Sequence, residues 1–497
     1  MNSNGEPMLL TLLVLVPLLT GLACWPLRKR AVLERLNLLA FGIVAVLAAW
    51  LGAEVLARGT VEAFGGFLRV DALSALVVCL TAFVALACGV YAIGYLREDE
   101  RAGKVNARLL HRYYVLTPIF VGTMMAVPLV NNLGLLWVAI ESSTLASVLL
   151  VRFYNQKSSL EAAWKYIILG SAGIALALFG TVLTYFAAVP VLGDHAEDGF
   201  NWSVLLEVAD KCQPAAMRLG FVMVLVGYGT KAGLAPMHTW KPDAYAEAPV
   251  PSAALLGAGF INCALYGIMR FHTLAAKCLG HDYTGTLLVL FGVASILVAA
   301  PFVLVQRNFR RLLDYSSIDH AGIMVAALGF GGKLGALGAV LHMLFHAVTK
   351  PLMFFCAGNV QQHYGSPYFR KVSGVLHTLP WTGGLFLMAT FAITGVPPFS
   401  LFQSEFTTLS AAVAADRAWP AGLFVAGIVT IFAGFLAHLS KLSLGKPPHA
   451  AARNAEGPWK LGAMLLVAAP VIALGVVLPA PIYELARRAA LVIGGTP

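Results

Sequence analysis

The feature that most restricts the fold of this 497-residue chain is its succession of apolar runs, most of them about 20 residues long. A transmembrane helix needs about 20 mostly apolar residues, whereas soluble domains carry about 25% charged residues. Here 59% of the residues are hydrophobic and only 12% are charged. We therefore predict an all-α polytopic membrane protein that crosses a lipid bilayer many times.

The apolar runs predict about fourteen transmembrane helices. Two of them, the seventh and the twelfth, contain glycine and proline and are expected to be broken within the membrane, where irregular backbone survives only inside protein or beside water. The breaks fall at Gly233 and Pro236 in helix 7, and at Gly395, Pro397 and Pro398 in helix 12. The spans lie near residues 8–26, 33–55, 72–95, 113–130, 133–151, 162–188, 217–235, 250–270, 285–305, 313–330, 336–359, 380–410, 420–440 and 460–480.

The basic residues predict the orientation. Of the 34 lysines and arginines, 21 lie in loops that join odd-numbered spans to even-numbered spans. The positive-inside rule places those loops in the cytoplasm and both chain ends outside. The net charge of +10 thus belongs to short membrane-flanking loops, and nucleic acid is not an expected partner.

Cofactor motifs are missing from the sequence. The seven cysteines form no CxxC pair, so iron–sulfur and zinc ligation have no support. Neither a dinucleotide fingerprint after a strand nor a Walker loop occurs. We expect no cofactor and no metal in this chain, so any redox chemistry would lie in another subunit.

Lys231 is a charge at membrane depth. It follows the apolar run of residues 219–226 and directly precedes the first helix break. A lysine there is unfavourable by roughly 2.5–3.5 kcal/mol on insertion scales. We interpret it as part of a buried proton or ion path. The alternative is a lysine near a helix end whose ammonium reaches the interface.

Further ionisable residues lie within other spans. Buried groups of this kind can pass a proton from one to the next. His342, His346 and Lys350 are spaced four residues apart and share one helix face. The first two also have the spacing of metal ligands, but no third ligand is evident. The remaining members of the expected path are Glu141, Lys165 and Glu405.

Other charged residues have simpler interpretations. Asp314 and Asp319 are candidate helix caps, and His320 is a candidate structural histidine. Arg310 is expected to anchor a loop, and Lys241 is placed in a loop.

The two breaks also echo each other. GLAPMHTW (residues 233–240) and GVPPFSLF (residues 395–402) both place glycine and proline three apart, each beside a charge. The breaks are five spans apart, which indicates inverted repeats with broken helices at corresponding positions.

Several longer motifs make the chain resemble the antiporter-like membrane subunits shared by respiratory complex I, Mrp cation/proton antiporters and membrane-bound hydrogenases, and most closely the F-type component of hydrogenase-4. They are SSLEAAWKYII, GTKAGLAPMHTWKPDAYAEAP, INCALYGIMRF, VLVQRNFRRLLDYSSI, LHMLFHAVTKPLMFF and GVPPFSLFQSEF.

The resemblance implies a domain plan. Residues 1–112 would hold helices 1–3, residues 113–270 a first five-helix repeat (helices 4–8), residues 285–440 a second, inverted repeat (helices 9–13), and residues 460–497 helix 14. Broken helices 7 and 12 would border a hydrated polar axis.

The resemblance also implies roles. Glu141 and Lys231 would form a coupling ion pair, and Lys165 would match a sixth-helix lysine. His342 and His346 would match the central histidines, and Glu405 an exit to one side. Asn262 departs from the pattern, because complex I and Mrp relatives usually carry lysine there and an asparagine holds no transferable proton.

The expected function is a non-catalytic, proton-translocating subunit of a hydrogenase-4/formate hydrogenlyase-like or complex I-like oxidoreductase complex, in a bacterial-type inner membrane. Its partners would be other membrane subunits and a peripheral redox arm, and its cargo protons, with Na+ left open. One alternative is an Mrp-type cation/proton antiporter or a subunit that energises inorganic-carbon uptake. Another is a scaffold subunit with a silent channel.

Overall fold

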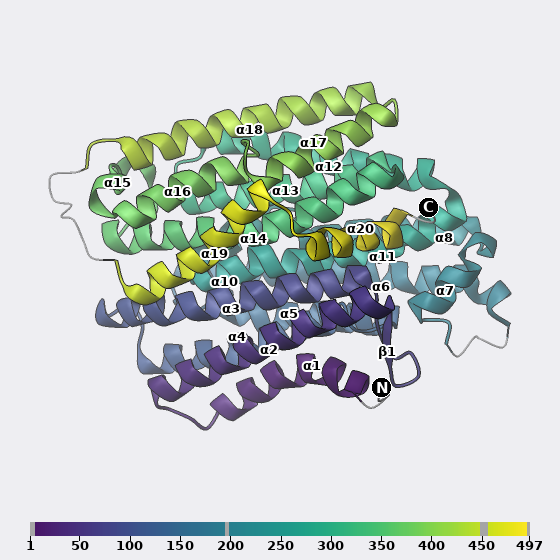
Figure 1. Ribbon diagram of the computed structural model, residues 1–497, viewed down its shortest axis with the longest axis horizontal. Helices are drawn as coiled ribbons and strands as arrows, with labels where there is room; N and C mark the ends of the chain where they lie inside the picture. The colour runs from purple at the N-terminus through teal and green to yellow at the C-terminus, as the bar shows by residue number, and fades with distance from the viewer. Residues whose placement is uncertain (1–4, 194–197, 448–455, 495–497) are drawn as a thin grey trace.

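The computed structural model describes residues 5–193, 198–447 and 456–494 and is a bundle of long helices that lie roughly side by side (Figure 1). The first described helix begins and the last one ends at the same end of the bundle (Figure 1). The predicted all-α architecture is confirmed, with one small addition. Strands β1 (Val61–Ala63) and β2 (Leu68–Val70) form an antiparallel ribbon between the second and third helices.

The first half of the chain supplies the helices up to the first break. They are α1 (Gly5–Cys24), α2 (Arg30–Arg58), α3 (Ala72–Arg101), α4 (Ala107–Ala126), α5 (Leu133–Val151), α6 (Lys157–Leu192), the short α7 (Trp202–Val208) with the 3-10 turn η2 (Ala209–Lys211), and α8 (Pro214–Ala232).

The second half begins with short elements after the break and continues in long helices. They are α9 (Lys241–Glu247), α10 (Val250–Ala254), the π-helical turn η3 (Leu255–Phe260), α11 (Ile261–Leu279), α12 (His281–Val305), α13 (Phe309–Phe330), α14 (Gly332–Tyr364), η4 (Phe369–Lys371), α15 (Val375–Thr378), α16 (Pro380–Ile393), α17 (Ser400–Ala414), α18 (Ala418–Leu444), α19 (Pro458–Val476) and α20 (Ala480–Gly494).

Each of the fourteen expected spans corresponds to a helix or to a pair of helices joined at a break. Of the helices in the described ranges, ten are long and apolar enough to cross a membrane. The remaining expected spans are shortened by a break, as α8 and the α16–α17 pair are, or carry several polar residues, as α4 and α13 do. The chain is thus a multi-pass membrane protein, and the count of fourteen stays a prediction.

Local signals explain where several helices begin. Asp71, Asn106, Asn132 and Asn308 each occupy the N-cap position, and their side-chain oxygens accept hydrogen bonds from backbone N–H groups of the first turn. Such caps satisfy donors that have no partner within the helix. At both predicted breaks the helix stops before a glycine with positive φ, Gly233 at 79° and Gly395 at 66°.

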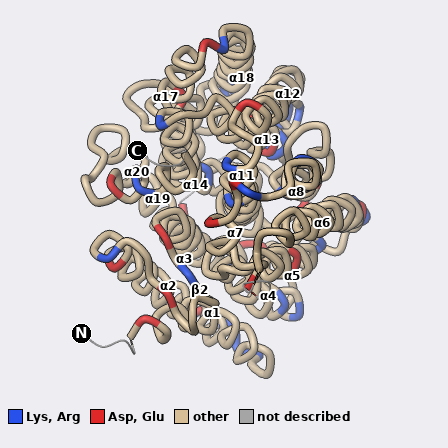
Figure 2. The backbone as a smooth tube through the Cα atoms, turned by 90° about the vertical axis from the view of Figure 1, so that its right-hand side faces the viewer, with Lys and Arg blue, Asp and Glu red and all other residues tan. Residues whose placement is uncertain are grey.

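The centre of the bundle is formed by the α10–α11 segment, α13 and α14. Every residue in the ranges 248–275, 312–330 and 338–360 is buried. Figure 2 looks along the bundle and shows α11 and α14 inside, with α1, α6 and α18 at the rim. These enclosed helices carry most of the ionisable residues that lie at depth, so protein surrounds those residues on all sides.

Candidate functional site

The ion pair Glu141–Lys231 joins α5 to the end of α8. The Nζ atom of Lys231 donates a hydrogen bond to Oε2 of Glu141 over 2.9 Å, and a second one to Oγ1 of Thr144. The Lys231 side chain is fully enclosed, whereas 18% of the Glu141 side chain is exposed. The structure thus brings together the two residues expected to pair, with the carboxylate on the more open side.

Neighbouring side chains hold this arrangement. Lys231 lies in the last turn of α8, one residue before its end, and a Cβ atom at Gly170 of α6 would lie 3.2 Å from the Lys231 Nζ atom. Only a glycine leaves full room for the ammonium at that point. Trp240 donates from Nε1 to the Thr230 carbonyl over 2.9 Å and stacks on Tyr166, which fixes the chain after the break.

Lys350 and the histidines lie on α14 as their spacing predicts. All three are fully buried. The Nζ atom of Lys350 donates to the Leu313 carbonyl over 2.6 Å and to Oγ of Ser316 over 3.0 Å, both on α13. An ammonium held by neutral acceptors can lose its proton without leaving an unpaired carboxylate behind.

A chain of histidines connects α13, α14 and α17. His320 Nδ1 lies 2.9 Å from His342 Nε2, and His342 Nδ1 lies 3.0 Å from Ser404 Oγ. The His346 ring lies 4.9 Å from the His320 ring, and neither of its nitrogens has a hydrogen-bond partner among the described residues. Imidazole accepts a proton on one nitrogen and releases it from the other, so this chain has the geometry of a proton relay.

Glu405 lies beyond the second break, on α17. It is partly exposed and lines an apolar pocket of about 300 Å³ between the break and α18. Its ligand oxygen and one nitrogen each of His320 and His342 all lie within 4.8 Å of one another. Three such ligands suit a zinc ion with one open position. His346 of the pair singled out in the sequence is not part of this set, and the set is not apparent in the sequence because its members are far apart along the chain.

Two residues of the expected path, Lys165 and Asn262, do not fit the pattern of a buried ionisable group. Lys165 is not buried. Its side chain is 45% exposed and pairs with Glu161 and Asp243 beside an open pocket of about 700 Å³. It faces outward because the buried face of α6 here carries Ala162, Ala163 and Tyr166.

Asn262, in contrast, is fully buried just after the π-helical turn. Its Nδ2 donates to the Ala258 carbonyl over 2.8 Å, and its Oδ1 has no partner among the described residues.

The structure corrects the simpler interpretations of Lys241 and Asp314. Lys241, placed in a loop, is the first residue of α9 and is 0% exposed. Arg310, expected as a loop anchor, is 2% exposed and donates to the Tyr245 and Ala248 carbonyls, so it holds the connection between α9 and α10. Asp314 is also fully buried and does not cap α13, because Asn308 does. His320 belongs to the histidine chain. No local pattern in the sequence points to these contacts, because they come from helices distant in the chain.

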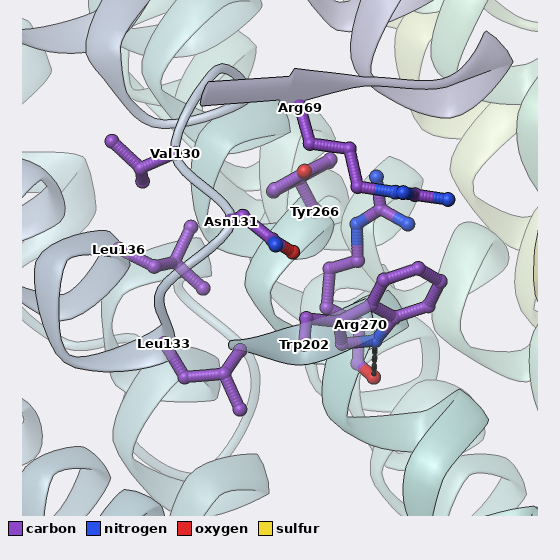
Figure 3. Close-up of a pocket in the computed structure, with 8 residues that line it drawn as sticks. All are labelled: Arg69, Val130, Asn131, Leu133, Leu136, Trp202, Tyr266 and Arg270. Atoms are coloured by element: carbon purple, nitrogen blue, oxygen red, sulfur yellow. Dashed lines mark hydrogen bonds between the residues drawn. The ribbon is translucent and has the colours of Figure 1, made fainter. Parts of the chain in front are cut away.

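A second buried ion pair lies near the start of α3. Arg270 of α11 donates to both oxygens of Asp71, at 2.6 and 2.8 Å. Its guanidinium lies 4.2 Å from the ring centroid of Trp202 and 4.8 Å from that of Tyr266 (Figure 3). Bidentate contacts and stacking of this kind fix geometry, so this pair is suited to hold helices together.

Two models of known protein families match this chain. The family model described as "NADH:quinone oxidoreductase/Mrp antiporter, TM" matches residues 130–432. A second, described as "NADH-Ubiquinone oxidoreductase (complex I), chain 5 N-terminus", matches residues 66–104. The first match covers α5 to α18 almost completely, including both broken helices and all the path residues discussed above.

Individual proteins agree with the family models. A hydrogenase-4 component F homolog of Methylacidiphilum infernorum is 38% identical over 77% of this chain and 80% of its own length. Hydrogenase-4 component B of Escherichia coli is 27% identical over 73% of this chain and 53% of its own length. The structure of an archaeal membrane-bound sulfane sulfur reductase contains a chain of the same fold, with a TM-score of 0.87, 24% identity and 97% coverage of both chains.

Proposed function

Because the chain belongs to the family of NADH:quinone oxidoreductase and Mrp antiporter membrane subunits, we propose that it is a proton-translocating subunit of a hydrogenase-4-like or complex I-like oxidoreductase complex. The single observation that carries this proposal is the burial of four ionisable side chains, Lys231, Lys350, His346 and His342, within the helix bundle. Groups that are so unfavourable in a membrane are retained where they carry ions or protons.

The proposed mechanism starts at Glu141. A redox or conformational event in a partner subunit changes the field at this carboxylate, whose side chain is 18% exposed. Weakening the ion pair favours the neutral form of Lys231, which then passes its proton toward His346, His342 and Glu405. The pair forms again and the path reloads. Biasing two such states needs only a few kcal/mol.

The remaining expected residues take accessory positions in this scheme. Lys165 borders the open pocket of about 700 Å³ and would supply protons at its mouth. Asn262, which lies fully buried beside the path, would orient water and hold no proton of its own. Glu405 would release the proton on the opposite side.

We also retain the division into repeats as a proposal. Residues 113–270 would form the first five-helix unit and residues 285–440 an inverted second one, preceded by helices within residues 1–112 and followed by one within residues 460–497. In support, each unit contains one broken helix, with Gly233 and Gly395 in left-handed conformation at the break.

Membership of this family also suggests where the chain lies and what it assembles with. The chain would lie in a bacterial-type inner membrane, beside other membrane subunits and a peripheral redox arm that holds the cofactors. The basic loops would face the cytoplasm. Relatives named as hydrogenase-4 components support this setting.

Proton flux through the reconstituted chain tests the proposal. The full chain is placed in liposomes with a pH-sensitive dye, and a potassium diffusion potential is imposed. We expect proton uptake that is unchanged when Na+ is replaced by choline. The imposed potential replaces the partner's event, because it also changes the field at Glu141. Liposomes that stay as tight as empty ones would therefore favour a silent scaffold subunit instead.

A cation/proton antiporter is the second candidate, because the matching family model includes the Mrp antiporters. Co-purification separates the two. A redox arm that purifies with the chain supports the oxidoreductase complex, whereas a lone zinc-binding partner supports a subunit that energises inorganic-carbon uptake. A Na+-dependent flux with no redox partner supports the antiporter.

A further inference from the structure

Lys241 is a buried lysine at the first residue of α9, directly behind the first helix break. Its side chain is 0% exposed. Its Nζ atom donates to the Ala232 carbonyl over 2.7 Å and to the Ser317 carbonyl over 3.1 Å. Ala232 is the residue after Lys231, so Lys241 connects the end of α8 with the middle of α13.

Asp314 is a buried carboxylate on the same stretch of α13. It is 0% exposed, and neither of its oxygens has a hydrogen-bond partner among the described residues. The basic side chains close enough to act on its charge are Arg310, Lys350, Lys241 and Arg311. Buried polar atoms without a protein partner are those that internal water or a proton satisfies. The carboxylate is therefore free to take up a proton.

Lys350 donates to the same stretch of α13 that carries Asp314. It donates to the Leu313 carbonyl, and Lys241 donates to the Ser317 carbonyl. These two carbonyls are four residues apart on α13 and therefore lie one above the other. The two ammonium groups thus contact one side of one helix, with Asp314 between their attachment points in the sequence.

The charges of this cluster do not balance when every group is ionised. Lys241, Lys350 and Arg310 are basic, and Asp314 and Asp319 are acidic, and all five are buried. Asp319 acts on Lys350, and the charge of Lys241 acts on His238, His320 and His346. A buried unpaired charge is strongly unfavourable. The cluster reaches neutrality by releasing one proton, which is the property of a carrier.

We propose that Lys241 and Asp314 form an additional proton-carrying site of this chain, placed between Lys231 and Lys350. This inference rests on the proposed function. A proton that arrives from Lys231 makes Lys241 an ammonium. That ammonium gives its proton through water to the Asp314 carboxylate, which leaves a neutral amine and a neutral acid. Once Lys350 has passed its own proton to His346, Asp314 protonates the resulting neutral amine, and the carboxylate is restored.

The additional site explains how a proton could pass through the chain although residue 262 is an asparagine. An asparagine donates and accepts hydrogen bonds but has no transferable proton at neutral pH. The route through α11 is therefore interrupted at that residue. Lys241 and Asp314 provide a parallel route through α9 and α13, which pack against each other.

A purely structural role for Lys241 is the competing explanation. A lysine at a helix C-terminus satisfies free carbonyls, and Lys241 does so for Ala232. That role needs a donor but no proton transfer, and it leaves the unpartnered oxygens of Asp314 unexplained. A glutamine at residue 241 keeps a donor and removes the carrier, so it separates the two roles.

Proton flux in liposomes containing the full chain tests the proposal. The variants are Lys241→Gln and Asp314→Asn. Their matched controls are Lys371→Gln and Asp282→Asn, both at exposed positions. Lys231→Gln serves as the reference, because normal flux in that variant would refute the proposed function itself.

We expect each test variant to slow proton flux about tenfold or more relative to its control. One positioned proton-transfer group typically contributes about 10²–10⁴-fold, and water can replace part of that contribution. The double variant should be no slower than the slower single one, because both residues serve one route. If Lys231→Gln blocks flux while Lys241→Gln and Asp314→Asn match their controls, the additional site is overturned and the proposed function stands.

A spectroscopic measurement decides the question if the variants fail to fold. Infrared difference spectra of the unmodified chain are recorded between acid and alkaline medium, and compared with those of Asp314→Glu, which keeps the carboxyl group. A protonated-carboxyl band that shifts in this variant supports the proposal. Identical carboxyl bands in the two proteins would show that Asp314 does not change protonation, and would overturn it.

Discussion

The ammonium of Lys231 is completely enclosed, yet the carboxylate it binds at 2.9 Å, that of Glu141, remains 18% open to the outside of the chain. The pair is therefore asymmetric. A neighbouring subunit can reach Glu141 directly, whereas the Lys231 side chain is not accessible from outside the chain. This asymmetry suits an input at Glu141 and a response at Lys231.

The space around Lys231 gives a first prediction. A Cβ atom at Gly170 would lie 3.2 Å from the Lys231 Nζ atom. Gly170→Val should push the ammonium away from Glu141 and slow proton flux about tenfold or more, the scale on which a misplaced transfer group acts. Gly42→Val, where a Cβ atom meets nothing within 4 Å, is the control in the same liposome assay. Equal flux in both variants would contradict the importance of this spacing.

The second break gives another prediction. Gly395 has φ of 66°, and a Cβ atom there would overlap the Glu405 carboxylate. Gly395→Ala should lower the free energy of unfolding by about 1–2 kcal/mol from the left-handed conformation alone, and displace Glu405 as well. Gly384→Ala, in open space within α16, should leave stability equal or higher. Thermal unfolding in detergent measures both, and a Gly395→Ala protein as stable as the control would be unexpected.

The histidine chain predicts a graded response. His342→Gln removes the ring that links His320 to Ser404 and should slow flux about 10²-fold or more. Ser404→Ala removes only the partner at 3.0 Å that orients the ring, so its effect should be smaller, with a changed pH profile. Flux measured over a series of pH values checks both. A Ser404→Ala defect as large as that of His342→Gln would argue against a relay through the ring.

The pair Asp71–Arg270 should support stability and not transport. Asp71→Asn leaves the buried Arg270 charge uncompensated, which costs about 3–5 kcal/mol. Replacing both, as Asp71→Asn with Arg270→Met, should cost less. Flux per folded molecule should stay normal in both. Detergent unfolding curves test this, and a single variant no less stable than the double one would contradict it.

The pH dependence of this contribution has a definite sign. Burial alone would raise the pKa of Asp71, but the positive charge and hydrogen bonds of Arg270 outweigh burial and hold that pKa below 3.8. A lowered folded-state pKa means that the stabilisation is present at neutral pH and is lost as the pH falls through the folded-state value. The stability difference between the native chain and Asp71→Asn should therefore shrink only in acid.

Much of the fold can be predicted from the sequence because membrane spans are local signals. An apolar run of about 20 residues can be recognised as a span without reference to the rest of the chain. Lys231 and Glu141 stand out for the same reason, since each is a single charge in an apolar run. Their pairing is implied by the family resemblance, and the structure places them in contact.

The rest depends on contacts between distant segments. Lys241 follows a helix break and precedes a proline, which in sequence is the pattern of a loop; its burial comes from α13 packing across α9. Asp314 lies near the start of a span, where a cap is the simpler interpretation. Lys165 lies in an apolar run but on the outward face of α6, because Ala162, Ala163 and Tyr166 occupy the buried face.

The most direct test of the central claim uses the assembled complex, with protons translocated and electrons transferred measured together in sealed vesicles. We predict that Glu141→Gln and Lys231→Ala each abolish proton translocation, while the redox partner subunits remain assembled. Unchanged proton translocation in either variant would contradict the account.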